Sequence, residues 1–440
     1  MSTRLRRRDP ARTTAYRILR AVTARGAYAN LELARQRTEL STQDAAFVTE
    51  LVAGTCRAMG SYDRIIAAAS RRSLGSLQPA AVDLLRLGAH QLLSMRVPAH
   101  AAISATADLA ALEVGERLVG LVNAVLRKVA VRDWDGWVEL LSADEDELGR
   151  LALRHHHPRW VTEAFAQVLP ADELTKLLTV DNIAPITTLA VRPGLADIAE
   201  VGLRPTLYSP YGGYADGDPN TLAAVGEGRI GVQDEGSQLV TLALARAEAP
   251  DGPWLDLCAG PGGKTALLTG LAAQAGQHLL ASERHPHRAE LVAANVRAYP
   301  LAERPLIIAA DGTVPPWREN SFSKVLADVP CTGLGALRRR PESRWRRQPS
   351  DLPELVALQR SLLSSAIAST RPGGVIAYVT CSPHQAETVE VVATAGDQVD
   401  VLPAADYLPE VPDAALGDFV QLWPHRHNTD AMFLALLRRR

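Results

Sequence analysis

Several features that would assign the chain to a protein class are missing from its 440 residues. It has only four cysteines, at positions 56, 258, 331 and 381, and none forms a C-x-x-C pair. This spacing argues against a disulfide framework and against a zinc site built from thiolates, so we expect no bound metal. No apolar run approaches the roughly 18 residues of a membrane span, and no apolar segment follows the arginine-rich start as a secretory signal requires. We therefore expect a reduced, cytoplasmic protein that does not bind a membrane.

Lysine is also scarce, since the chain has four lysines among its 47 basic residues and a net charge of −2. Nearly all positive charge is therefore carried by arginine, which suits phosphate recognition through its bidentate fork. At the N-terminus, five arginines stand against one acid, Asp9. This arm is compatible with a solvated tail or with a segment that binds nucleic acid. The five are Arg4, Arg6, Arg7, Arg8 and Arg12.

The hydropathy pattern predicts three domains. Over residues 1–140, apolar residues recur at helical spacing, as in the positions i, i+3, i+4 and i+7 from Leu118, which predicts an all-α bundle. Residues 141–230 mix helical segments with one short strand at 186–191, which predicts a small α+β connecting domain. Over residues 231–440, strands alternate with helices, which predicts a doubly wound, mostly parallel α/β sheet.

This sheet should contain six strands, and Asp234 is the expected cap of the helix that precedes the first of them. The strands are expected at residues 254–257, 278–282, 306–309, 324–327 and 375–379, and near 432–436.

Two groups of aromatic or ring-bearing residues leave alternatives open. Three consecutive histidines, at 155–157, point in different directions on any regular backbone, which favours a turn before Pro158 over a metal site. Tyr208, Tyr211 and Tyr214 lie in a stretch rich in glycine and proline. They could stack on unpaired bases, but aromatics in such a loop more often pack it down.

The most informative stretch is WLDLCAGPGGKT, at residues 254–265. A strand pattern enters a glycine-rich turn and continues as a helix, and ligands of open α/β sheets bind at such turns. A P-loop would need a glycine where Cys258 stands, and a dinucleotide fingerprint would need one where Thr265 stands. Both nucleotide motifs therefore fail by one residue. The third common user of such a turn is S-adenosylmethionine, and Glu283, at the end of the next expected strand, is spaced to bind its ribose.

Two cysteines follow the fourth and fifth expected strands. Cys331 lies in DVPC, three residues after Asp328, and Cys381 lies in TCSP. Because the carboxyl ends of parallel strands meet at one edge of a sheet, adjacent strands would bring both cysteines together beside the glycine turn. A single cysteine is often only a small core residue, but two at strand exits favour a chemical role.

Three segments carry a more specific resemblance: LDLCAGPGGKT, ADVPCTGLGALRRRPESRW and YVTCSP. They resemble motifs of the RNA 5-methylcytosine methyltransferases, in particular the bacterial Fmu/Sun type. VDLLRLGAHQLLSMRVPAHAAI and LVNAVLRK resemble the NusB-like, RNA-binding helical domain that this group carries at its N-terminus. The resemblance covers nearly the whole chain. It implies a multidomain enzyme with a NusB-like bundle, a small connecting domain and a Rossmann-like methyltransferase domain that uses S-adenosylmethionine on RNA.

The resemblance also implies roles for single residues. It makes Cys381 the nucleophile, gives Cys331 a part in product release, and puts Asp328 between the cofactor and the base. DNA cytosine methyltransferases attack with the cysteine of their P-C motif, so spacing alone leaves the choice of nucleophile open. The implied cofactor contacts are Cys258, Ala259, Gly260, Pro261, Gly262, Gly263, Lys264, Glu283, Asp311 and Asp328.

Cysteine and an acid are the residue types that this reaction needs. Carbon 5 of cytosine is too weak a nucleophile to accept a methyl group unaided, and addition of a thiolate at carbon 6 makes it enamine-like. An acid near N3 can share a proton as the adduct forms, which is the role expected of Asp328. A thiol with a pKa of about 8.5 is only slightly ionised at pH 7, so a nearby positive charge would help Cys381.

The arginine-rich residues 338–347 follow the Cys331 motif and include Trp345. A solvated basic face is one interpretation, but the position beside the expected catalytic edge favours phosphate contacts to RNA. We expect 16S ribosomal RNA as the substrate. The same chemistry on tRNA, or a non-catalytic RNA-binding assembly factor on a methyltransferase fold, are the alternatives. No obligate protein partner is expected.

Overall fold

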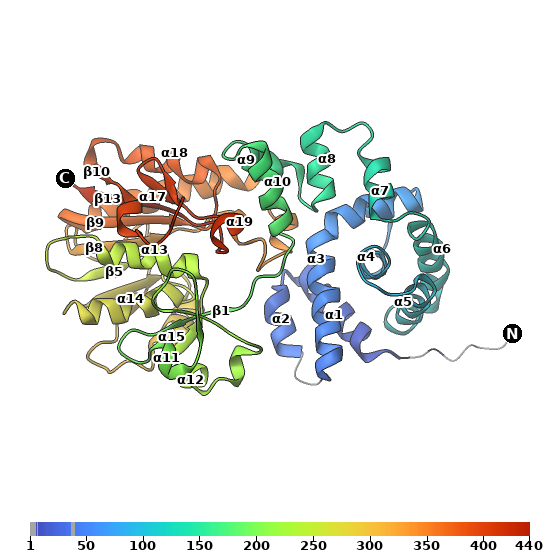
Figure 1. Cartoon of the computed structure of the whole chain (residues 1–440), viewed down its shortest axis with the longest axis horizontal. Coiled ribbons are helices and arrows are strands. Elements are labelled where there is room, and N and C mark those ends of the chain that lie inside the picture. The colour runs from blue at the N-terminus through green and yellow to red at the C-terminus, as the bar shows by residue number, and fades with distance from the viewer. Residues whose placement is uncertain (1–5, 7, 37–39) are drawn as a thin grey trace. The chain divides into compact units, whose positions relative to one another are not determined.

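The computed structural model describes residue 6 and residues 8–36 and 40–440. They form two compact units (Figure 1). The helical unit comprises Met1–Ile183 together with a later segment, Leu337–Arg347.

The sheet unit comprises the two remaining parts of the chain, Ala184–Ala336 and Gln348–Arg440. The segment 141–230, which the sequence predicted as one connecting domain, is therefore shared between the units, with the division at residue 183.

The helical unit is a bundle around α4, which Figure 1 shows nearly end-on with α1, α3, α5 and α6 around it. Its main apolar core draws on all of these helices. The helices are α1 (Pro10–Arg25), α2 (Ala29–Gln36), α3 (Thr42–Ser70), α4 (Pro79–Leu93), α5 (Ala99–Glu113), α6 (Val119–Val129), α7 (Trp134–Leu141), α8 (Glu147–Arg154), α9 (Arg159–Ala166), α10 (Ala171–Val180) and α16 (Ser343–Arg346).

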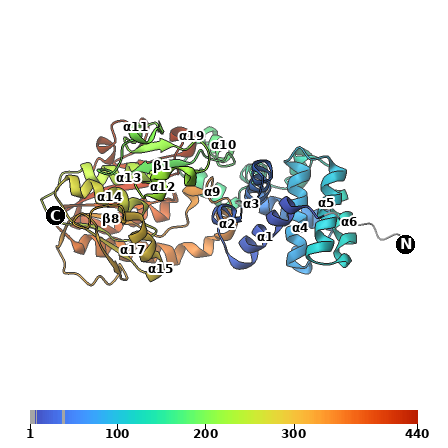
Figure 2. The ribbon, with the colours of Figure 1, turned by 90° about the horizontal axis from the view of Figure 1, so that it is seen from below.

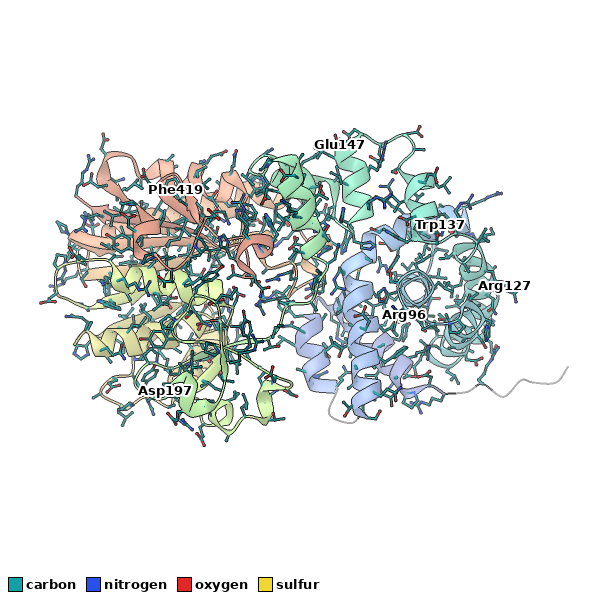
Figure 3. The ribbon with its side chains drawn as sticks, viewed as in Figure 1. Arg96, Arg127, Trp137, Glu147, Asp197 and Phe419 are labelled. Atoms are coloured by element: carbon teal, nitrogen blue, oxygen red, sulfur yellow. The ribbon has the colours of Figure 1, made fainter. Side chains whose placement is uncertain are left out.

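Local signals explain where these helices begin. Asp9 caps α1 by accepting a hydrogen bond from the Arg12 amide, and proline occupies the first turn, where no amide hydrogen is needed. Ser41 caps α3 in the same way. Trp137, labelled in Figure 3, attaches α7 to the bundle because its indole Nε1 donates to the Val129 carbonyl at 2.9 Å. Over the described residues, the expectation of a wholly helical N-terminal part is confirmed.

A small antiparallel sheet opens the sheet unit, with the strand order β2-β3-β1-β4. Its strands are β1 (Thr188–Val191), β2 (Arg204–Pro205), β3 (Gly212–Tyr214) and β4 (Ile230–Val232). Two short helices accompany it, α11 (Ile198–Val201) and α12 (Ala223–Gly226). β4 leads directly into α13 (Glu235–Arg246), which Asp234 caps as predicted.

The large sheet has nine strands in the order β11-β12-β13-β9-β8-β5-β6-β7, with β10 paired to β13. The five strands from β5 to β9 pair in parallel, and β13 pairs antiparallel to β9. The strands are β5 (Trp254–Asp256), β6 (Leu279–Glu283), β7 (Leu306–Ala309), β8 (Phe322–Asp328), β9 (Thr370–Thr380), β10 (Val399–Leu402), β11 (Ala415–Leu416), β12 (Phe419–Gln421) and β13 (Phe433–Arg439).

Helices cover both faces of this sheet. Alternate residues of β9 point to opposite sides, so Val375 and Ala377 pack with α13 and α14 (Gly263–Gln274), whereas Ile376 and Tyr378 pack with α17 (Leu352–Ser369). Figure 2 shows α13 and α14 on one side of β8 and α17 on the other. The remaining helices are α15 (Pro286–Val296), α18 (Val389–Val392) and α19 (Pro424–His427).

The doubly wound sheet predicted from the sequence is confirmed, and all six expected strands are present. The sequence missed the short strands β10, β11 and β12, which extend the sheet beyond β13. Phe419 of β12, labelled in Figure 3, packs on Phe433 of β13 with ring centroids 5.4 Å apart. No helix in the described part of the chain is long and apolar enough to cross a membrane.

Candidate active site

The glycine turn lies where the strand order of the large sheet reverses. β5 has β6 on one side and β8 on the other, so residues 257–262 leave the sheet at its topological switch point and lead into α14. Gly262 has a φ of +109°, and a Cβ there would stand 2.8 Å from the Val292 Cα. A Cβ on Gly260 would overlap the Glu283 carboxylate. The turn thus requires glycine at both positions.

Glu283 ends β6 and faces this turn. One carboxylate oxygen accepts the Gly260 amide at 3.0 Å, and the other accepts the His285 amide at 2.9 Å. The Arg288 guanidinium donates to the Gly260 carbonyl at 2.6 Å. These contacts fix the carboxylate against the turn. Its position at the end of the neighbouring strand is the one expected for a ribose-binding acid.

Asp311 follows β7, the next strand outward. Its Oδ1 accepts the Thr313 amide at 2.9 Å and the Thr313 hydroxyl at 2.7 Å, and these bonds lower the pKa of the Asp311 carboxyl. The Arg284 guanidinium lies 3.6 Å from its Oδ2. The parallel order β5-β6-β7 therefore puts the glycine turn, Glu283 and Asp311 at one edge of the sheet.

Asp256 is buried at the end of β5, and Cys258, in the turn that follows, is half-buried. Asp256 Oδ2 accepts the Thr265 hydroxyl at 2.7 Å, and burial raises the pKa of Asp256 to about 7. Burial also raises the pKa of the Cys258 thiol well above its ordinary value, and the carboxyl of Asp256 adds to the effect. A thiol that resists ionisation is a poor nucleophile. Cys258 is therefore a weaker candidate nucleophile than Cys381.

Cys331 and Cys381 meet at the ends of two adjacent strands. β8 and β9 pair in parallel, with Asp328 opposite Val379, and the two sulfur atoms lie 3.4 Å apart. The sequence predicted this meeting from the strand order, and it is confirmed. The hydrogen bond between the thiols lowers the pKa of Cys381 and raises that of Cys331, and burial raises the latter further. Burial also raises the pKa of Cys381, but the hydrogen bond from Cys331 outweighs it, so Cys381 is the more readily ionised thiol of the pair.

Lys264 joins the glycine turn to this cysteine pair. Its Nζ lies 2.8 Å from Asp328 Oδ2. Burial alone would lower the pKa of Lys264, but the Asp328 carboxylate outweighs it and the pKa is raised. The ammonium charge in turn helps to lower the pKa of Cys381, which the Asp328 carboxylate opposes. One hydrogen bond therefore links the turn to the acid expected to act on the base.

Two protein-family models match the chain, one over its N-terminal part and one over its C-terminal part. The family model described as 16S rRNA methyltransferase RsmB/F matches residues 241–438, and the NusB family model matches residues 9–131. Ribosomal RNA small subunit methyltransferase B of Pseudomonas putida is 32% identical over 393 residues, which cover 87% of each chain. The chain belongs to the RsmB/F family.

Two further likenesses extend over the whole RsmB/F chain. Rv1407 of Mycobacterium tuberculosis, a methyltransferase candidate, is 50% identical over 449 residues, covering 98% of this chain and 97% of Rv1407. The crystal structure of PH0851 superposes with a TM-score of 0.80 at 22% identity, covering 99% of this chain and all of that one. The structural likeness supports the fold of both units.

The sequence missed a buried carboxylate that ties the two cysteine loops of this RsmB/F protein together. Glu387 is fully buried and accepts the Thr332 amide at 2.8 Å and the Gln359 side-chain amide at 3.0 Å. The Thr332 hydroxyl also donates to Glu387 and lies 3.1 Å from the Ser382 hydroxyl. Thr332 and Ser382 directly follow the two cysteines. No local pattern distinguishes Glu387 from the exposed Glu390, so the sequence offered no signal.

The arginine-rich segment corrects a prediction made from the sequence. It belongs to the helical unit, where Arg344 is fully buried and donates to the carbonyls of His156 and Asp181 and to the Asn182 side chain, at 2.8 to 3.1 Å. Phosphate contact is therefore wrong for Arg344. Its neighbour Trp345 donates its indole hydrogen to the Arg57 carbonyl at 2.9 Å.

Arg346, in the same segment, is likewise engaged inside the helical unit. Its guanidinium donates to the carbonyls of Gly26, Val22 and Ala27. The segment thus contributes structural anchors, which local composition could not reveal.

The N-terminal arm is only partly described, since Arg4 and Arg7 lie outside the described residues. Arg6 forms ion pairs with Asp108 at 2.9 Å and Glu116 at 2.8 Å. Arg12 pairs with Asp9 and donates to Gln91. At least these two arginines are bound to the bundle by acids or amides.

Among the tyrosines of the stretch rich in glycine and proline, Tyr214 packs into the fold, which favours packing over base stacking for this residue. Tyr214 is buried in β3, with the Arg204 guanidinium 4.3 Å from its ring centroid.

The three histidines at 155–157 form a turn between α8 and α9, as expected. His157 is buried, with its Nδ1 2.7 Å from the His155 carbonyl.

Proposed function

We propose that this protein transfers a methyl group from S-adenosylmethionine to carbon 5 of a cytosine in 16S rRNA, through a covalent adduct between Cys381 and carbon 6. The observation that carries the proposal is the pair of thiols 3.4 Å apart at the edge where the glycine turn, Glu283 and Asp328 also lie. Membership of the RsmB/F family and the likeness to small-subunit methyltransferase B support the RNA substrate.

The residues at the turn fit the cofactor. The glycines let the backbone approach a ligand closely, and the Glu283 carboxylate, held by two backbone amides, suits a pair of ribose hydroxyls. Asp311 lies farther along the same edge, where the adenine would be bound. S-adenosylmethionine supplies an electrophilic methyl group and needs no phosphate site.

Cys381 starts the reaction. Its thiolate forms a bond to carbon 6 of the cytosine, and the electron pair of the carbon 5–carbon 6 double bond moves to carbon 5. The proton that the Cys381 thiol releases passes to the Asp328 carboxylate, and Asp328 shares it with N3, which takes up the charge that spreads into the ring. Transfer of the methyl group to carbon 5 would break the sulfonium–methyl bond and leave S-adenosylhomocysteine. Solvent then takes the carbon 5 proton, the electron pair of that bond restores the carbon 5–carbon 6 double bond, and the carbon 6–sulfur bond breaks with its electrons on the Cys381 sulfur. Lys264, whose Nζ lies 2.8 Å from Asp328 Oδ2, positions this acid.

Cys331 acts in product release. The hydrogen bond with Cys381 and burial raise the pKa of the Cys331 thiol, and its sulfur lies 3.4 Å from that of Cys381. A thiol in this position can exchange a proton with the departing Cys381 sulfur. Without it, the adduct should persist.

Single-cysteine variants test this division of roles. We expect Cys381→Ala to abolish transfer of labelled methyl groups, and Cys331→Ala to accumulate a protein–RNA adduct that survives a denaturing gel. Cys56→Ala is the matched control, since Cys56 is buried in the helical unit and should leave both readouts unchanged. An adduct with Cys381→Ala and none with Cys331→Ala would reverse the assignment.

The substrate is tested separately. Purified protein and labelled cofactor are incubated with unmethylated 16S rRNA and with unmethylated tRNA, and bisulfite sequencing locates the product. We expect incorporation into 16S rRNA. Incorporation into tRNA alone would favour the tRNA alternative, and none from a folded protein that binds both RNAs would favour a binding factor without catalysis.

A further inference from the structure

Gln233 is a buried side chain that the proposed reaction does not use. It joins β4 to α13, and its backbone is fixed on both sides, since its amide donates to the Thr188 carbonyl at 3.0 Å and its carbonyl accepts from Gln238 Nε2 at 3.2 Å. Only 7% of the residue is exposed. The side chain therefore projects from a rigid junction.

The polar end of this side chain lacks partners. Among the described residues, neither Oε1 nor Nε2 of Gln233 has a hydrogen-bond partner. Most buried polar groups in proteins are hydrogen-bonded, because an orphaned donor or acceptor has lost its water without compensation. An amide with both ends free at a rigid site is therefore best explained by a ligand that satisfies both.

The side chain faces the start of α14. A Cβ built on Gly263, the first residue of that helix, would stand 3.7 Å from the Gln233 Cδ. The first turn of a helix presents amide hydrogens that favour an anion, and no side chain caps α14. The α14 terminus thus offers donors, and Gln233 adds one donor and one acceptor.

This set of groups matches a zwitterion. A carboxylate would take hydrogen bonds from Gln233 Nε2 and from the amides of α14, and an ammonium group would donate to Gln233 Oε1. Lys264 cannot take the place of these donors, because its Nζ is bound to Asp328.

We infer that Gln233 binds the α-amino-acid end of S-adenosylmethionine. The inference rests on the proposed function, since it assumes that this cofactor occupies the glycine turn. It assigns the cofactor's recognition to two sides of the site: Glu283 for the nucleoside, and Gln233 with the α14 terminus for the amino acid.

Isothermal titration tests the inference with two ligands that differ only in the amino acid. S-adenosylhomocysteine carries it, and 5′-methylthioadenosine lacks it. We expect Gln233→Met, which keeps the shape without donor or acceptor, to weaken S-adenosylhomocysteine about 10- to 100-fold and methylthioadenosine less than about 2-fold. The control is Gln274→Met, at the exposed C-terminal end of α14, which should change neither affinity.

A second variant keeps the test decisive if the first folds poorly. Gln233→Glu preserves the size and one acceptor but puts a negative charge beside the carboxylate, so it should weaken S-adenosylhomocysteine and spare methylthioadenosine. Equal losses for both ligands, or unchanged cofactor affinity with a raised KM for RNA, would overturn the inference. A wild-type protein that binds neither S-adenosylmethionine nor S-adenosylhomocysteine would instead refute the proposed function.

Discussion

Replacement of Glu387 tests whether a buried carboxylate sets the distance between the thiols of Cys331 and Cys381. Glu387 receives the Thr332 amide, the Thr332 hydroxyl and the Gln359 side chain, and Thr332 in turn contacts Ser382. Each cysteine is therefore covalently next to a residue of this network. We expect Glu387→Ala to loosen the two loops against each other.

The magnitude follows from the groups left behind. Thr332 is 2% exposed, so its buried amide loses an acceptor, whereas Gln359 Nε2 retains the Pro330 carbonyl at 2.9 Å. An orphaned buried donor costs about 1–3 kcal/mol, and bonds to a charged group contribute somewhat more than neutral ones. We expect the free energy of unfolding to fall by about 2–5 kcal/mol.

The matched variant is Glu387→Gln. Its Oε1 can still accept from Thr332 and Gln359, and its Nε2 can donate to the Thr332 hydroxyl, which accepts as well as donates. Urea unfolding should show that Glu387→Gln lowers the free energy of unfolding by less than half as much as Glu387→Ala does.

Two functional readouts accompany the unfolding measurement. A displacement of about 1 Å can cost about 100-fold in rate, so kcat for methyl transfer should fall by roughly that factor in Glu387→Ala, with unchanged cofactor affinity. Oxidation with diamide should join Cys331 and Cys381 more slowly than in wild type, where the sulfurs lie 3.4 Å apart. The reasoning fails if Glu387→Ala unfolds like wild type and closes this disulfide at the wild-type rate.

Two further predictions concern buried charges. Arg344→Met should leave the salt dependence of RNA binding unchanged in fluorescence anisotropy, whereas a lost phosphate contact would lower the slope by about 0.7. Because the pKa of Asp256 is raised to about 7, the folded chain keeps a proton that the unfolded chain releases above about pH 4, so wild-type stability falls as pH rises from about 4 to 7. Asp256→Asn should remove this decline of about 4 kcal/mol in urea unfolding, and an equal decline in the variant would contradict it.

The parts predicted well are those fixed by periodicity and by strand order. Alternation of strands and helices is enough to put Cys331 and Cys381 on one edge, because parallel neighbours align their carboxyl ends. The short strands β11 and β12, of two and three residues, carry no period that could have predicted them. Their positions depend on pairing with β13, which is a tertiary contact.

The parts predicted poorly depend on burial, which composition does not reveal. An arginine is rarely fully buried, so six of them in a short run indicate a surface that binds phosphate. Arg344 is an exception, because its guanidinium donates hydrogen bonds to backbone carbonyls of the helical unit. Burial lowers the pKa of Arg344 to about 9, yet it stays cationic at neutral pH.

Lys264 shows how the two halves of the site depend on each other. Its sequence position assigned it to the cofactor turn, yet its Nζ lies on Asp328, the acid expected to act at N3 of the base. Lys264 favours ionisation of Cys381 and the Asp328 carboxylate opposes it, so this ion pair makes two opposing contributions at the proposed nucleophile. Any movement of the turn that draws Lys264 away would change both the nucleophile and the acid. We therefore expect cofactor binding and base activation to be coupled through this side chain.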